Sequence, residues 1–79
     1  MKEKVIEIFT DVTGSDDIAE DLDLNLFEAG LLDSLAIIEV LLQIEERLGI
    51  KLQPTDLERE DMSTVNKLTA FLENWKNQQ

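Results

Sequence analysis

The sequence predicts an all-α protein: a four-helix bundle with three longer helices, one short third helix and a long loop between the first two. Apolar residues recur at helical spacing in three stretches of the chain. Gly14 and Gly49 directly follow two of these stretches, where glycine commonly ends a helix. Because 79 residues are about the length of one small domain, residues 1–79 are expected to form a single domain.

The first helix is predicted from Lys2 to about Thr13. Its apolar residues fall at i, i+3, i+4 and i+7 and therefore share one face: Val5, Ile8, Phe9 and Val12. Gly14 is expected to end this helix, because glycine accepts the left-handed conformation that follows a helix end.

Residues 15–32 form a long connection, and loops of this length are uncommon in compact domains unless they have a function. Acidic residues alternate here with apolar ones, namely Ile18, Leu22, Leu24, Leu26 and Phe27. We expect the apolar side chains to pack on the helices and hold the loop in place. A strand at 22–26 is the alternative, but the chain offers no second clear strand to pair with it.

The second helix is predicted from Ser34 to about Leu48. Asp33 is the expected N-cap, because its carboxylate can accept a backbone N–H that the first turn leaves unpaired. Gly49 is expected to close the helix.

Two further helices are predicted after this point. Pro54 can begin a helix but not continue one, so a short third helix is expected over residues 55–60. The fourth helix is capped by Ser63 or Thr64 and runs to about Lys76, and the last three residues are expected to fray. Its apolar residues recur at helical spacing: Val65, Leu68, Leu72 and Trp75.

The second helix has more apolar surface than a small core needs. One stripe can face the core, and it consists of Ile37, Val40, Leu41, Ile44 and Leu48. A second stripe consists of Leu35, Ile38 and Leu42, and it is flanked by Glu39, Glu45 and Glu46. This second stripe predicts an exposed ridge that docks a basic partner. The alternative is that the long loop or the short third helix covers it.

The composition restricts the partners. The net charge is −11, from 18 acidic and 7 basic residues, so the chain should repel nucleic acids and anionic membranes and attract basic proteins. The first residues lack the apolar core of a signal peptide, and no apolar run approaches the ~18 residues of a spanning helix. We therefore expect a cytoplasmic protein without direct membrane insertion, and nothing in the sequence argues against a monomer.

The residue types also restrict the chemistry. The chain has no cysteine, histidine or tyrosine, and hence no thiolate nucleophile, imidazole base or His/Cys metal site. Asp21-x-Asp23-x-Asn25 begins like a calcium loop, but Leu26 stands where glycine is needed and Leu32 where glutamate is needed. A short helical domain also leaves little room for a deep pocket. We therefore expect no catalytic residue and no metal ligand in this chain.

Ser34 is the candidate for covalent chemistry. A serine at the start of a helix commonly acts only as a cap, but here Asp33 supplies the cap and leaves the Ser34 hydroxyl free to point outward. A phosphate ester on this hydroxyl would lie near the positive end of the helix dipole, although Asp33 would repel it. We therefore expect the hydroxyl to carry a group rather than to catalyse a reaction.

The residues around Ser34 resemble those of a known family. Asp33-Ser34-Leu35, followed by Ile38-Glu39-Val40 and Glu45-Glu46-Arg47-Leu48-Gly49-Ile50, resembles the acyl carrier protein superfamily, and the likeness covers nearly the whole chain. The stretch Asp23-Leu24-Asn25-Leu26-Phe27-Glu28-Ala29-Gly30-Leu31-Leu32-Asp33-Ser34 is most similar to the D-alanyl carrier proteins of Gram-positive bacteria. The Asp-Ser-Leu core is weakly specific by itself, whereas the extended stretch is strongly specific.

This resemblance implies an acyl-carrier-like four-helix bundle and a function. A phosphopantetheinyl transferase would attach 4′-phosphopantetheine to Ser34, with Asp33 and Leu35 completing the modification motif. A D-alanine–carrier protein ligase would load D-alanine, and a membrane acyltransferase would receive it for the D-alanylation of teichoic acids in the cell wall. The resemblance also implies a partner-binding face made of Leu35, Ile38, Glu39, Leu42, Glu45 and Glu46.

The sequence departs from two related groups of carriers. Fatty-acid carriers often have an acid two residues after the modified serine, where this chain has Ala36, and peptidyl carriers differ at the place of Leu31-Leu32. Two alternatives remain open on the sequence: an acyl carrier for fatty-acid or secondary-metabolite synthesis, and a helical adaptor that binds its partners without a covalent arm. In none of these functions is the chain itself an enzyme.

Overall fold

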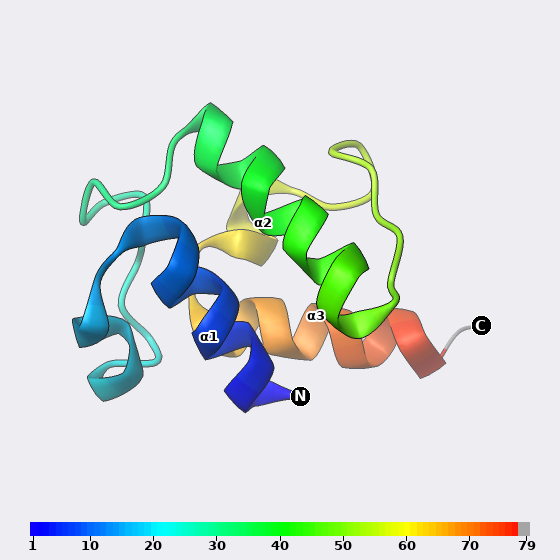
Figure 1. Ribbon diagram of the computed structural model, residues 1–79, viewed down its shortest axis with the longest axis horizontal. Coiled ribbons are helices and arrows are strands. Elements are labelled where there is room, and N and C mark those ends of the chain that lie inside the picture. Colours follow the sequence, from blue (N-terminus) through cyan, green and yellow to red (C-terminus); the bar gives the residue numbers. More distant parts are fainter. Residues whose placement is uncertain (78–79) are drawn as a thin grey trace.

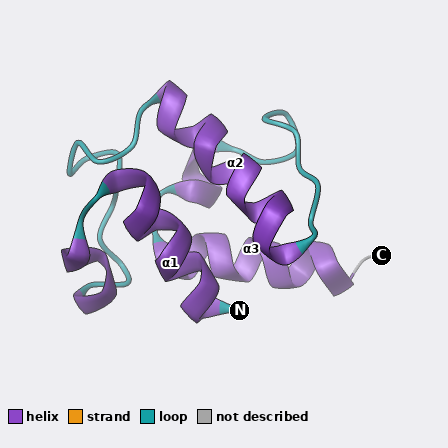
Figure 2. Ribbon diagram, viewed as in Figure 1, coloured by secondary structure: helices purple, strands orange, loops and turns teal. Residues whose placement is uncertain are grey.

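The computed structural model of the protein describes residues 1–77, and this part of the chain is helical with no strand (Figures 1 and 2). Three α-helices alternate with two short 3-10 helices: α1 Lys2–Thr13, the 3-10 helix Asp16–Glu20, α2 Ser34–Leu48, the 3-10 helix Arg59–Met62, and α3 Val65–Asn77. None of these helices is both long and apolar enough to cross a membrane. The prediction of an all-α fold is therefore confirmed.

The predicted ends of α1 and α2 are confirmed. Gly14 and Gly49 follow the two helices with φ values of 73° and 68°, in the left-handed region that glycine occupies without steric cost. At the start of α3, the Thr64 hydroxyl accepts a hydrogen bond from the Lys67 N–H at 3.0 Å, so Thr64 is the cap. The Ser63 hydroxyl instead donates to the Glu60 carbonyl at 2.7 Å.

The predicted short third helix over residues 55–60 is wrong. In its place the Gln53 N–H donates to the Asp56 carboxylate at 2.8 Å while the Asp56 N–H donates to the Gln53 carbonyl at 2.9 Å. This pairing closes a single turn, and no further backbone hydrogen bond in this described segment continues it before Asp61. A 3-10 helix begins only at Arg59, behind a reciprocal cap between Glu58 and Asp61. The described chain therefore has three α-helices, and a four-helix bundle is not what forms.

The predicted end of the last helix needs a smaller correction. Asn77 belongs to α3, one residue beyond the predicted end and inside the tail that was expected to fray. The other two residues of that tail, Gln78 and Gln79, lie outside the described residues.

A single apolar core lies where the three helices meet (Figure 1). It contains the predicted faces of α1 and α3 together with one stripe of α2, of which Val40, Leu41 and Ile44 are buried and Ile37 and Leu48 are half-buried. Burying a side chain of this size contributes about 1.5–3 kcal/mol. The full set of buried apolar residues is Val5, Ile8, Phe9, Ile18, Leu26, Leu32, Val40, Leu41, Ile44, Leu52, Met62, Val65, Leu68 and Leu72.

The long loop before α2 packs onto the helices, as predicted, and the alternative strand at 22–26 is wrong. Ile18 and Leu26 have no exposed surface, and Leu22, Leu24 and Phe27 are half-buried against the core. The Leu26 N–H donates to the Ser63 carbonyl at 2.7 Å, and the Leu26 carbonyl accepts from the N–H groups of both Leu31 and Leu32. The Leu26 backbone groups that a strand would have paired with a neighbouring strand are thus used within the loop and with Ser63.

The left-handed glycine after α1 yields a test of how this helix ends. Gly14→Ala should lower the free energy of unfolding by about 1 kcal/mol, because a Cβ at φ 73° is strained even though no atom lies within 4 Å of it. Gly14→Asn should cost less, since asparagine tolerates this conformation. Urea unfolding followed by circular dichroism measures both. Equal stability of the alanine variant and the wild type would contradict a left-handed Gly14.

Candidate functional site

Ser34 is exposed at the first residue of α2. The preceding Asp33 has extended backbone angles, and its carboxylate accepts a hydrogen bond from the Ala36 N–H at 2.8 Å. Asp33 is therefore the N-cap, as predicted, and the Ser34 hydroxyl is not needed for that role. The first-turn N–H groups that the cap leaves unpaired lie beside this hydroxyl.

The chain around Ser34 is anchored on both sides. Two residues before it, Leu32 is buried and its N–H donates to the Leu26 carbonyl at 3.2 Å. After it, α2 begins at once, and Val40 in the second turn is fully buried. The hydroxyl therefore stands on a rigid base while its own surface remains open to solvent, an arrangement suited to a modifying enzyme.

The second apolar stripe of α2 is exposed. The exposed fractions are 67% for Leu35, 49% for Ile38 and 55% for Leu42, which are large values for apolar side chains. The loop and the segment after α2 therefore do not cover this stripe, and the interpretation that they would is wrong. We call these three residues the α2 ridge. Solvent-exposed carboxylates flank it: Glu39, Glu45 and Glu46.

A shallow hollow of about 160 Å³ lies beside the α2 ridge. Its lining includes Ile38, Leu42 and Glu45 from α2, together with Leu52 and Pro54 from the segment that follows the helix. The predicted face did not include the last two residues, because their approach to α2 depends on how the chain turns back after Gly49. The apolar pattern of Ile50-Lys51-Leu52 was the available signal.

Only part of the predicted partner-binding face forms one continuous surface. Ile38, Leu42 and Glu45 line the same hollow, whereas Leu35 lies next to Ser34 in the first turn of α2. No group of three or more acidic side chains is placed to hold a metal ion within residues 1–77. The site therefore combines an exposed serine hydroxyl, a helix start and an apolar ridge flanked by acids.

These features suit a phosphopantetheine ester. The prosthetic group needs an exposed serine hydroxyl with space around it, and the N-terminus of α2 favours a negatively charged phosphate. Consistent with this fit, the chain matches the family described as "Phosphopantetheine attachment site" over residues 3–72. Fold, site and family match together define a carrier domain whose prosthetic group is 4′-phosphopantetheine.

Individual proteins similar to this chain show to which group of carriers it belongs. The "D-alanyl carrier protein" of Lactococcus lactis subsp. lactis (strain IL1403) is 40% identical over 78 residues, covering 99% of each chain. The protein of that name from Lacticaseibacillus rhamnosus is 41% identical over 92% of this chain and 90% of its own length. The one from Enterococcus faecalis (strain ATCC 700802 / V583) is 40% identical over 92% of this chain and 94% of its own length. This chain belongs to the D-alanyl carrier protein family, which confirms the resemblance seen in the sequence.

The cap at Asp33 provides a test of how the site is built. Asp33→Ala should lower the free energy of unfolding by about 1 kcal/mol, because the Ala36 N–H loses its acceptor. Asp33→Ser retains a capping oxygen and should lose much less. Both values can be measured by urea unfolding. An alanine variant as stable as the serine variant would contradict the capping role.

Proposed function

We propose that this protein carries D-alanine on a phosphopantetheine arm attached to Ser34 and delivers it for the D-alanylation of teichoic acids in a Gram-positive cell wall. The observation that carries the proposal is the exposed Ser34 hydroxyl at the start of a capped helix, in a chain about 40% identical to D-alanyl carrier proteins over nearly its full length. The whole of residues 1–79 would act as one carrier domain on the cytoplasmic side of the membrane, as a monomer.

The attachment forms one phosphodiester. In the proposed step the Ser34 oxygen attacks the pantetheine-bearing phosphorus of coenzyme A, the bond to the nucleotide phosphate breaks, and the nucleotide leaves. The proton of the hydroxyl passes to the phosphopantetheinyl transferase, because this chain has no histidine and the neighbouring Asp33 carboxylate serves as the helix cap. Once bound, the arm supplies a terminal thiol that holds the cargo as a thioester, which the chain could not form with its own residues.

The partner face follows from the surface of α2. The α2 ridge offers apolar contact close to Ser34, and Glu39, Glu45 and Glu46 favour a partner with basic side chains around an apolar patch. We assign this face to the transferase, the D-alanine–carrier protein ligase and the membrane acyltransferase in turn. Asp33 and Leu35 flank Ser34 and would contact the transferase directly.

The attachment can be tested by intact mass. After incubation with coenzyme A and a phosphopantetheinyl transferase, the wild-type chain should gain one phosphopantetheine, and Ser34→Ala should gain none. Ser63→Ala is the matched control and should still be modified, because the Ser63 hydroxyl is buried and donates to Glu60. The modified chain should then form a D-alanyl thioester with ATP, D-alanine and the ligase.

Each failure in this experiment has a separate meaning. If the wild type gains no mass while a known carrier is modified alongside it, the chain is a non-covalent adaptor. If the modified chain rejects D-alanine but accepts fatty acyl groups efficiently, the chain is an acyl carrier for another pathway.

The partner face can be tested by removing the ridge. Ile38→Ala combined with Leu42→Ala should lower kcat/KM for D-alanine loading about tenfold, because central apolar contacts dominate such interfaces. The fold should remain stable, since both side chains are about half exposed. Ala70→Ser with Glu73→Gln on the exposed surface of α3 is the control and should leave loading unchanged. Equal loading by the ridge variant would exclude these two residues from the interface.

A further inference from the structure

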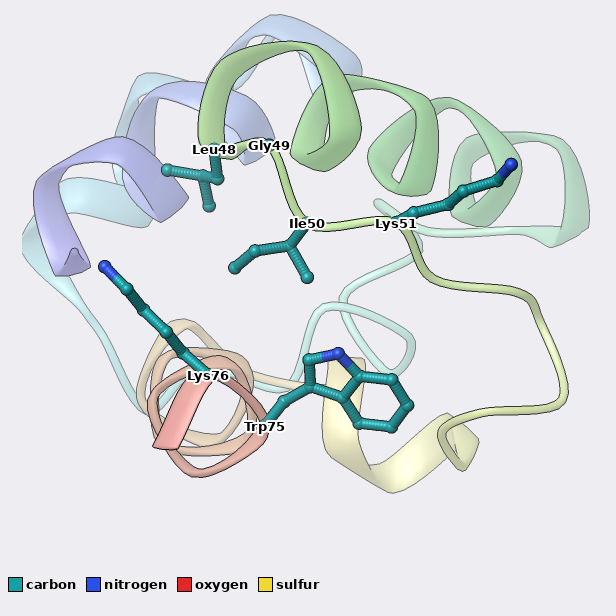
Figure 3. Close-up of a pocket in the computed structure, with 6 residues that line it drawn as sticks. All are labelled: Leu48, Gly49, Ile50, Lys51, Trp75 and Lys76. Atoms are coloured by element: carbon teal, nitrogen blue, oxygen red, sulfur yellow. The ribbon is translucent and has the colours of Figure 1, made fainter. Parts of the chain in front are cut away.

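A hollow lies at the far end of α2 from Ser34. It has a volume of about 630 Å³ and is formed by the end of α2, the segment after it and the end of α3 (Figure 3). The 15 residues of α2 place Leu48 about 21 Å from Ser34 along the helix axis. This hollow is therefore remote from Ser34, although Lys51 lines both this hollow and the one beside the α2 ridge.

A second hollow of about 300 Å³ adjoins the first. The two share Leu48, Ile50 and Lys76, so they form one continuous concave surface. We call this surface the basic end. It is lined by Met1, Lys4, Arg47, Leu48, Gly49, Ile50, Lys51, Trp75 and Lys76.

The basic end has an unusual charge for this protein. Four of the seven basic residues of the chain line it, whereas none of the 18 acidic residues does. Arg47 is partly neutralised by α1, because it pairs with Asp11 and lies 3.5 Å from the carboxylate of Glu7. Lys4, Lys51 and Lys76 are exposed and form no ion pair with any residue of the described chain.

Helix dipoles do not explain this concentration of lysines. Arg47 and Lys76 lie in the last turns of α2 and α3, where a positive charge is favourable. Lys4 lies in the first turns of α1, where the dipole disfavours a positive charge. The dipole therefore does not account for its charge, and a bound anion would stabilise it in addition to Glu7 at i+3.

The floor of the hollow is formed by the apolar side chains of Leu48, Ile50 and Trp75, and polar groups make up the larger share of its exposed lining. In Figure 3 the Ile50 side chain lies between Leu48 and the indole of Trp75, and the two lysine side chains extend to opposite sides. Trp75 stacks on Phe71 with a centroid distance of 5.8 Å, which holds the indole in place, and it remains half-exposed. A flat organic group could lie on this floor while lysines at its edge bind phosphate.

We propose that the basic end is a second binding site, for a small organic molecule that carries more than one phosphate. The volume of the hollow is within the range of small-molecule sites, and a concave surface suits such a ligand better than a flat membrane does. The net charge of −11 does not prevent binding, since charges farther away than about 8 Å are largely screened at physiological salt. This proposal does not depend on the function of Ser34.

ADP is a suitable probe, because it combines a flat ring with a diphosphate. Trp75 is the only tryptophan of the chain, so its fluorescence, excited beyond the absorption of adenine, reports on this hollow directly. ADP should change the emission in a saturable and salt-dependent way and should shift the amide resonances of Gly49 and Ile50. Pyrophosphate should bind more weakly than ADP, and adenosine should not bind at all.

Matched variants distinguish binding at the basic end from non-specific electrostatic attraction between ADP and surface lysines. Lys4→Gln with Lys76→Gln should weaken ADP binding about tenfold. Lys2→Gln with Lys67→Gln removes the same charge from residues that do not line the basic end, and should change the affinity little. Ser34→Ala should bind ADP like the wild type, which distinguishes this site from the attachment site.

Three outcomes would overturn the proposal. One is the absence of a saturable change up to about 10 mM ADP. Another is an equal loss of affinity in the two double-lysine variants. The third is binding to phosphatidylglycerol vesicles, but not to phosphatidylcholine vesicles or to ADP, which would identify the basic end as a lipid-binding surface instead.

Discussion

The position of Ser34 depends on how Leu26 holds the long loop. The Leu26 side chain is fully buried, its N–H donates to Ser63 next to α3, and its carbonyl accepts from the N–H groups of Leu31 and Leu32. One residue thus ties the loop to the far helix and also closes the loop just before α2 begins. Ordering the residues before Asp33 costs about 1–2 kcal/mol each in conformational entropy, and the burial and hydrogen bonds of Leu26 offset part of this cost. The exposed hydroxyl is therefore presented by a rigid base.

The two faces of α2 have different roles: one stabilises the core, and the other is exposed and available for contact with other proteins. Val40, Leu41 and Ile44 join the core, while Leu35 and Leu42 remain exposed on the other face. In so small a protein, each exposed apolar side chain gives up stabilisation that burial would have provided. A surface of this kind is typical of contact with other proteins, and the flanking carboxylates prevent it from being uniformly apolar. The same helix thus supports the core and offers the surface that we assign to the partners.

The charges are unevenly distributed between the ends of the molecule. Acidic residues flank Ser34 and the α2 ridge, whereas lysines from α1, α3 and the segment after α2 meet at the opposite end. The net charge of −11 is a sum over the whole chain and does not show this uneven distribution. The two surfaces adjoin, because Lys51 lines both the basic end and the hollow beside the α2 ridge, whereas Ser34 lies at the other end of α2.

The sequence by itself determined the bounds of α1 and α2 and the Asp33 cap, because glycine ends and aspartate caps act over a few neighbouring residues. It also predicted that Ser34, beside this cap, would be exposed at the start of α2. It failed at residues 55–60, where the turn between Gln53 and Asp56 is not continued by further backbone hydrogen bonds although the composition permits a helix. Tertiary structure alone decided which hydroxyl caps α3, that the α2 ridge stays uncovered, and that Lys4, Lys51 and Lys76 meet at one end. These outcomes depend on contacts between residues far apart in the chain, which local spacing does not encode.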